Sequence, residues 1–167
     1  IDNSPIVSYS EQKSISTEST FEQDSIDVKR IKSILIAMVE KVAFTLREQK
    51  KLTSCITVKI RYANFDTETK QIHIPYTSSD HVLLRVVSEL FDRLYNRRML
   101  IRLVGVRLSN LVHGNHQISL FDDTEESINL YEAMDRMRHK HGVDKLVRAT
   151  TLDVNKRIRM EMNAFKG

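Results

Sequence analysis

Apolar residues recur every three or four positions along two stretches of the chain, and this spacing predicts two amphipathic helices. The first helix should begin after Asp24 or Ser25, either of which could cap it, and should stop near Lys50. Ser78 or Ser79 could cap the second. The apolar stripe of the first helix comprises Val28, Ile31, Leu35, Met38, Val42 and Leu46. That of the second comprises Leu83, Val86, Val87, Leu90, Phe91 and Leu94.

Four other stretches predict β-strands. Residues 12–21 are rich in Ser and Thr and favour a strand by propensity alone. Residues 52–65 alternate between apolar and polar side chains, as expected for a strand with one buried and one wet face. Shorter strands are expected at 70–75 and at 99–111. The inward residues of these last three strands would be Ile56, Val58, Ile60 and Tyr62, then Ile72 and Ile74, then Val104, Val106 and Leu108.

The order strand, helix, strand, strand, helix, strand predicts an α+β domain of the ferredoxin-like, split βαβ type. In this arrangement two helices cover one face of a four-stranded antiparallel sheet and leave the other face open. We expect the domain to span residues 11–112, after a linker at 1–10, and the last strand to form a closing edge of the sheet.

The polar side of the predicted sheet carries Lys59, Arg61, Gly105 and Arg107, together with hydroxyl groups such as that of Thr57. An RNA-binding sheet of this topology would be expected to place aromatic rings there to stack bases, and this side has none. Its hydroxyls and cations suit phosphate groups, which predicts salt-dependent, sequence-tolerant binding. Charge alone does not distinguish such a surface from a solvated one.

A short apolar segment follows the last predicted strand across a polar, turn-prone link at residues 113–116. Ile118, Leu120 and Phe121 stand beyond that link, with Asp122 and Asp123 directly after them. Exposed apolar anchors on a tether are typical of a linear motif that another protein binds. We therefore interpret residues 113–123 as a linker with a binding motif.

Residues 124–167 form an extension. Asp123 and Glu126 have the spacing of a capping box, which predicts a helix that stops at His141-Gly142. Residues 143–152 could form a short strand, and residues 155–165 a basic terminal helix or tail. The apolar side of the first helix would comprise Leu130, Tyr131, Met134 and Met137.

Composition narrows the class of protein without naming its function. The formal net charge is +4 and the pI is near 9.2, which is compatible with nucleic-acid binding but common elsewhere. The single Cys55 excludes an intrachain disulfide and fits a reducing compartment, as a structural cysteine. No secretory signal or membrane-length apolar run is visible, so we expect a cytoplasmic protein. The chain starts at Ile1, which suggests a piece of a longer protein.

The chain contains no recognisable catalytic motif. No carboxylate pair has metal-binding spacing, and a chain with four glycines offers no Gly-rich phosphate loop. The pairs His113-x-x-His116 and His139-x-His141 lack partner ligands at zinc-site spacing, so solvated histidines are favoured. We expect no catalysis from this chain by itself.

Three ordered motifs together resemble the Y-family translesion DNA polymerases of the DinB/UmuC type over residues 1–123. Lys13-Ser14-Ile15, followed by Thr20-Phe21, resembles the first strand of their little-finger domain, with Ser16 in place of a glycine. The sequence RLVGVRLSNL at residues 102–111 resembles its last strand. The sequence QISLF at residues 117–121 resembles the motif that binds the bacterial β sliding clamp, with Ile118 in place of leucine.

The resemblance implies a domain that docks on primer–template DNA while a tether holds the clamp. Its carried-over phosphate-facing residues would be Lys13, Ser14, Arg102, Gly105 and Arg107; Thr17, Lys59 and Arg61 join them by the alternation argument. Arg102 has the wrong parity and needs a β-bulge or a strand end to reach DNA. The clamp-binding residues would be Gln117, Ile118, Ser119, Leu120 and Phe121.

The resemblance also implies a parent polymerase that uses magnesium, held by carboxylates of a palm domain absent here, so no cofactor is expected in this chain. Some forty residues follow the clamp motif, as in the UmuC type, whereas the first strand looks more like DinB, and the subclass stays open. The alternative is an RNA-binding or protein-interaction module of the same topology, unrelated to replication.

Overall fold

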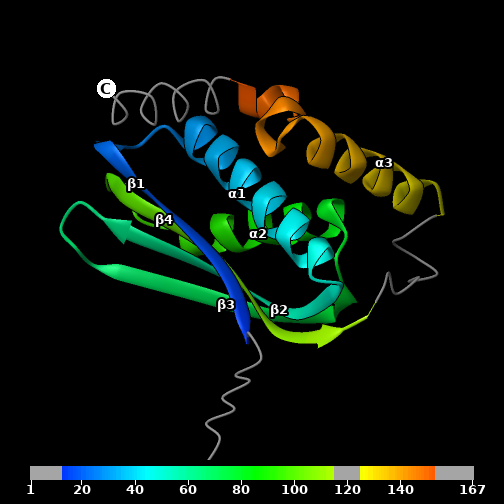
Figure 1. Ribbon diagram of the computed structural model, residues 1–167. Coiled ribbons are helices and arrows are strands. Elements are labelled where there is room, and N and C mark those ends of the chain that lie inside the picture. Colours follow the sequence, from blue (N-terminus) through cyan, green and yellow to red (C-terminus); the bar gives the residue numbers. More distant parts are fainter. Residues whose placement is uncertain (1–12, 115–124, 153–167) are drawn as a thin grey trace, which may run out of the picture.

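A computed structural model describes residues 13–114 and 125–152. The expected linker at 1–10, the QISLF segment and the expected terminal helix lie outside these residues. The elements follow the expected order, strand, helix, strand, strand, helix, strand, and then a third helix (Figure 1). Their bounds are β1 Ser14–Ser25, α1 Val28–Glu48, β2 Lys51–Tyr62, β3 Thr67–Thr77, α2 Asp80–Leu94, β4 Ile101–His113 and α3 Glu125–His141.

The four strands form one antiparallel sheet in the order β1-β4-β2-β3. β4 lies between β1 and β2, so the expectation that it forms an edge was wrong. The reason is the split βαβ connection: the crossover through α1 leaves a gap between β1 and β2, and β4 fills it by pairing with both strands. The chain is thus an α+β, ferredoxin-like domain, as the periodicity predicted.

The core lies between the sheet and helices α1 and α2, which cover one of its faces (Figure 1). The inward residues of β2 and β4 are the expected ones, and each is at most 1% exposed. Ile72 and Ile74 of β3 are partly buried and pack against the same core, since β3 is an edge strand. Each fully buried side chain of this size stabilises the fold by roughly 1.5–3 kcal/mol. Cys55 is buried and free.

The residues that cap the two core helices differ in part from those predicted. Asp27, rather than Asp24 or Ser25, caps α1, and its carboxylate accepts the backbone N–H of Arg30 at 3.1 Å. β1 continues to Ser25, whose hydroxyl accepts the N–H of Asp27. Ser79 is the N-cap residue of α2 as predicted, but its hydroxyl bonds the ring of His81 instead of the helix backbone.

Helix α3 lies over α1 on the side away from the sheet (Figure 1). The predicted apolar side of α3 is partly wrong, because Leu130 and Met137 are 57% and 49% exposed, and only Tyr131 among the four is buried. The predicted strand at 143–152 is also wrong. Two short 3-10 turns, Val143–Lys145 and Ala149–Thr151, form there instead.

Buried ion pairs hold α3 against the other helices. Arg47 of α1 bonds Asp80 at the start of α2 at 2.5 Å and Asp135 of α3 at 2.6 Å. Its guanidinium also lies 5.3 Å from the ring centroid of Tyr131. Burial alone would lower the pKa of Arg47, but its hydrogen bonds to the Asp135 carboxylate and the charge of Asp80 raise it above its ordinary value. Arg47 therefore links all three helices.

A second group of ion pairs also joins α3 and the residues after it to α1. Arg138 of α3, with 2% of its side chain exposed, lies 3.7 Å from Glu40 of α1, and Arg148 lies 3.0 Å from the same carboxylate. Burial raises the pKa of Glu40, although the charges of Arg138 and Arg148 act to lower it. Residues 125–152 are therefore packed on the domain as part of its structure.

Replacing Arg47 with methionine should lower the free energy of unfolding by about 3–5 kcal/mol, because the buried Asp80 loses its countercharge. Urea denaturation followed by circular dichroism measures this loss. The matched control is Lys32→Met, which breaks the exposed Lys32–Asp92 pair on the same helix and should cost less than about 1 kcal/mol. Equal losses in the two variants would contradict a stabilising role for the buried pairs of Arg47.

Candidate nucleic-acid interface

The strand registers bring four rows of side chains onto the face that α1 and α2 leave uncovered. Residues directly opposite one another in antiparallel strands point to the same side, so each row crosses all four strands. We call these residues the open face. In the order β1, β4, β2, β3 they are Ser14, Ser109, Cys55 and His73; Ser16, Arg107, Thr57 and Gln71; Glu18, Gly105, Lys59 and Thr69; Thr20, Leu103, Arg61 and Thr67.

Arg107 stands at the centre of this surface and is exposed to solvent. Ser16 and Thr57 flank it on the neighbouring strands, and both carry hydroxyls. Within residues 13–114 and 125–152, no carboxylate forms an ion pair with Arg107. An exposed guanidinium between hydroxyl groups is suited to bind a phosphate oxygen.

Gly105 allows a charge pair to form across the central strand. Lys59 of β2 bonds the carboxylate of Glu18 of β1 at 2.8 Å, and both residues are aligned with Gly105 of β4 between them. A Cβ at position 105 would lie 3.0 Å from Cγ of Glu18, so a side chain there would push Glu18 away. Gly105 is on the predicted face, but it is buried beneath Glu18 instead of being presented to a ligand.

Arg61 is on the predicted face and half-buried. Its Nε donates to the hydroxyl of Thr67 on the neighbouring strand at 3.0 Å. Ser14 is half-buried opposite Ser109, and Lys13 is exposed just before β1 begins. Thr17 was wrongly predicted to join this set. It pairs with Val106, which is 1% exposed, and therefore faces the helices.

Arg102 occupies a β-bulge. From the sequence, such a bulge or a strand end was required for this side chain to leave the core side of the sheet. Leu103 pairs with Arg61 and Ile101 with Tyr62, so Arg102 is the extra residue between two consecutive pairs. Its Nε and Nη2 each donate to the carboxylate of Asp24, both at 3.1 Å. This hydrogen bonding raises the pKa of Arg102.

Sequence reasoning missed the two carboxylates that pair with these cations, Glu18 and Asp24. The alternation in β1 carried the information for Glu18. Ile15 and Phe21 have the same parity and are both buried, which places Thr17 inward and Glu18 outward. No local pattern marks Asp24, because its partner lies 78 positions away in the sequence.

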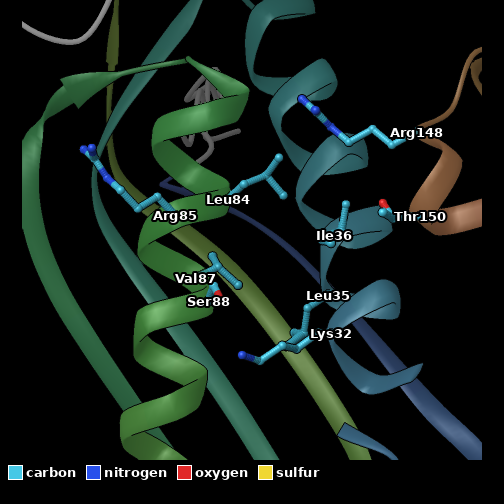
Figure 2. A pocket seen from close by; sticks show the side chains of 9 residues that line it. All are labelled: Lys32, Leu35, Ile36, Leu84, Arg85, Val87, Ser88, Arg148 and Thr150. Carbon is cyan, nitrogen blue, oxygen red and sulfur yellow. The ribbon is translucent and has the colours of Figure 1, made fainter. Parts of the chain in front are cut away.

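A cavity of about 360 Å³ lies on the opposite side of the molecule, between α1 and α2 (Figure 2). Its lining contains no carboxylate and no histidine, and two of its cations pair elsewhere, Lys32 with Asp92 and Arg148 with Glu40. The lining residues are Lys32, Leu35, Ile36, Leu84, Arg85, Val87, Ser88, Arg148 and Thr150. The cavity therefore offers apolar surface but no acid–base chemistry.

The described parts of the chain contain no group of three or more His, Cys, Asp or Glu residues that could hold a metal ion. No helix among them is long and apolar enough to cross a membrane. The proposed clamp-binding residues at 117–121 lie outside the described residues. The site that the structure brings together is therefore the open face and its bulged corner.

Comparison with known proteins identifies the domain. Residues 12–120 match the family model described as the impB/mucB/samB family C-terminal domain. A protein named DNA polymerase IV from Dehalococcoides mccartyi is 33% identical over 144 residues, which cover 85% of this chain and 37% of that protein. Another of the same name, from Clostridium acetobutylicum, is 33% identical over 158 residues, which cover 92% and 40%.

A solved structure of a related polymerase has the same fold as this domain. The crystal structure of DinB from Sulfolobus solfataricus matches 60% of this chain and 29% of that one, with a TM-score of 0.53 and 20% identity. The chain spans about two fifths of the length of the two curated relatives. The chain belongs to the impB/mucB/samB family and carries its C-terminal domain, the little-finger domain of Y-family DNA polymerases.

Proposed function

We propose that the open face holds primer–template DNA by its phosphates, as part of a translesion polymerase. The observation that carries this proposal is the position of Arg107, exposed and without an ion-pair partner among the described residues, in a row with Ser16, Thr57 and Gln71. Hydroxyl, amide and guanidinium groups contact phosphate and sugar without reading the bases. A binding surface of this kind tolerates any sequence.

The charge pairs on the same face set the strength of this grip. Glu18 neutralises Lys59, and Asp24 neutralises Arg102. Among the described residues, Arg107 and Arg61 have no ion-pair partner, and of these two Arg107 is the exposed one, since Arg61 is half-buried and donates to the hydroxyl of Thr67. An unbroken row of cations would bind DNA tightly and release it slowly. A face with few free charges favours weak, reversible contact, and the rest of the affinity then depends on the parent protein and on the clamp.

The alternative, an RNA-binding module unrelated to replication, gains no support from this surface. The four rows of the open face contain no Phe, Tyr or Trp on which unpaired bases could stack side by side.

We further propose that residues 117–121 bind a β sliding clamp and that the whole protein is a DNA-directed DNA polymerase. Leu120 and Phe121 would fill an apolar pocket of the clamp, and Gln117 would orient the peptide through its side-chain amide; Ile118 and Ser119 complete the motif. The motif lies between β4 and α3, which both belong to the folded domain. The polymerase would hold its magnesium with carboxylates of a palm domain, as the resemblance to the Y-family polymerases implies.

Arg107→Ala should weaken binding to duplex DNA by a similar factor whatever its sequence, and it should lower the slope of log K against log salt by about 1. Fluorescence anisotropy with several labelled duplexes over a salt series measures both effects. Lys41→Ala is the matched control, because it removes an equal charge from the exposed side of α1 and should change neither quantity. A loss confined to one sequence would contradict phosphate binding.

Glu18→Gln should strengthen duplex binding roughly threefold, because it removes a negative charge from the face and releases Lys59. The same anisotropy titration detects the change. Glu89→Gln, on the exposed side of α2, changes the net charge equally and should have no effect. Weaker binding by the Glu18 variant would show that the Lys59–Glu18 pair itself is needed for contact.

Replacing both Leu120 and Phe121 with alanine should abolish binding of the chain to a bacterial β sliding clamp, since the apolar anchors are lost. Isothermal titration with purified clamp measures the affinity. DNA binding by the same variant serves as the control for folding and should be unchanged. Clamp affinity equal to that of the unaltered chain would rule out the motif.

A further inference from the structure

We propose that Phe65 and Arg102 form a stacking platform for an unpaired nucleobase at one end of the open face. This inference rests on the proposed DNA-binding function and deepens it, because it assigns the single-stranded part of a primer–template to a place on the domain. Neither residue reads a base edge, so any nucleobase would fit.

Phe65 is displayed to solvent from a well-defined turn between β2 and β3. It is 65% exposed and has a φ of 70°, a backbone conformation that bulky side chains rarely adopt. Its N–H donates to the carbonyl of Tyr62 at 3.0 Å, and the N–H of Tyr62 donates to Asp66 at 2.9 Å. A strained, exposed aromatic residue in a hydrogen-bonded turn points to a functional role rather than to packing.

Arg102 covers one side of this ring. Its guanidinium carbon lies 4.5 Å from the ring centroid of Phe65, within the range of a cation–π contact. The two hydrogen bonds from Arg102 to Asp24 fix the guanidinium, which in turn limits rotation of the ring. Because most of Phe65 stays accessible, the side of the ring away from Arg102 is open to a planar ligand.

The platform continues the open face. The carbonyl of Phe65 accepts the hydroxyl of Thr67 at 3.4 Å, and that hydroxyl accepts Nε of Arg61 at 3.0 Å. Figure 1 shows the β2–β3 turn at the same end of the sheet as the end of β1 and the start of β4, where Asp24 and Arg102 lie. A DNA strand whose phosphates follow the face therefore reaches the ring at this end.

Charge alone does not explain a site here. Two of the cations around the turn are paired, Arg102 with Asp24 and Arg97 with Asp66 and Glu68. Arg61 has no ion-pair partner among the described residues, but its Nε donates to the hydroxyl of Thr67. The pairing of Arg102 and Arg97 weakens the attraction of this corner for a duplex backbone, and the exposed ring of Phe65 offers a contact that does not depend on charge. Stacking on aromatic residues tolerates every base and needs bases that are not paired, which selects a single-stranded overhang.

Phe65→Trp provides a direct test, because the chain contains no tryptophan and the variant carries a single indole at the proposed site. Binding of a duplex with a single-stranded overhang should quench its fluorescence through base stacking. The matched probe has an overhang of the same length without bases, which keeps the phosphates but should leave the fluorescence unquenched. Equal signals from the two DNAs would overturn the proposal.

Affinity measurements test the stacking platform and the phosphate-binding role of the open face separately. Phe65→Leu, which keeps apolar bulk but removes the ring, should reduce the preference for overhang over blunt duplex about tenfold, by the usual strength of base–aromatic stacking. Arg107→Ala in the Phe65→Trp background should weaken binding of every DNA and preserve the quenching amplitude at saturation. An unchanged overhang preference in Phe65→Leu would contradict the platform, whereas unchanged binding by Arg107→Ala would contradict the proposed function.

Discussion

The antiparallel pairing of β4 with both β1 and β2 is the constraint on which the rest of the structure depends. These two ladders decide which side chains of three strands share a face. They place Val104, Val106 and Leu108 under the helices, and they place Arg107 between two hydroxyl-bearing residues on the other side. A shift of one residue in either ladder would exchange the core with the open face, so burial of the apolar side also fixes the geometry of the binding side.

Charge is used in two different ways in this molecule. Between the helices, Arg47 donates hydrogen bonds to both Asp80 and Asp135, and little of the three side chains is exposed, because unpaired charges there would be costly. On the open face the pairs are partly exposed and contribute little to stability. There they decide which cations are available: Lys59 and Arg102 are neutralised, whereas Arg107 and Arg61 have no ion-pair partner among the described residues.

Because α3 packs on the domain, the QISLF segment before it is followed by a folded element. The helix is not a separate extension, since Arg138 and Asp135 reach side chains of α1 and since Tyr131 is buried. The QISLF segment therefore joins two elements of one packed domain.

Local patterns in the sequence determined the elements, their order and their buried sides. The periods of two and of three to four residues act over short distances, so they were sufficient to predict the two helices of the core, the inward residues of β2 and β4, and an aromatic-free open face. Even Thr17 could have been placed inward from the parity of Ile15 and Phe21. The motif resemblance added the family and the segment at 117–121.

Contacts between residues far apart in the chain were decided only by the tertiary structure. The central position of β4, the Glu18–Lys59 pair over Gly105, the bulge at Arg102 with its partners Asp24 and Phe65, and the polar docking of α3 all join segments separated by tens of residues. Periodicity carries no information on such pairs, because it records which side of an element is buried and not what lies opposite. The chemistry of the open face depends on those opposite partners, and they appear only when the chain is folded.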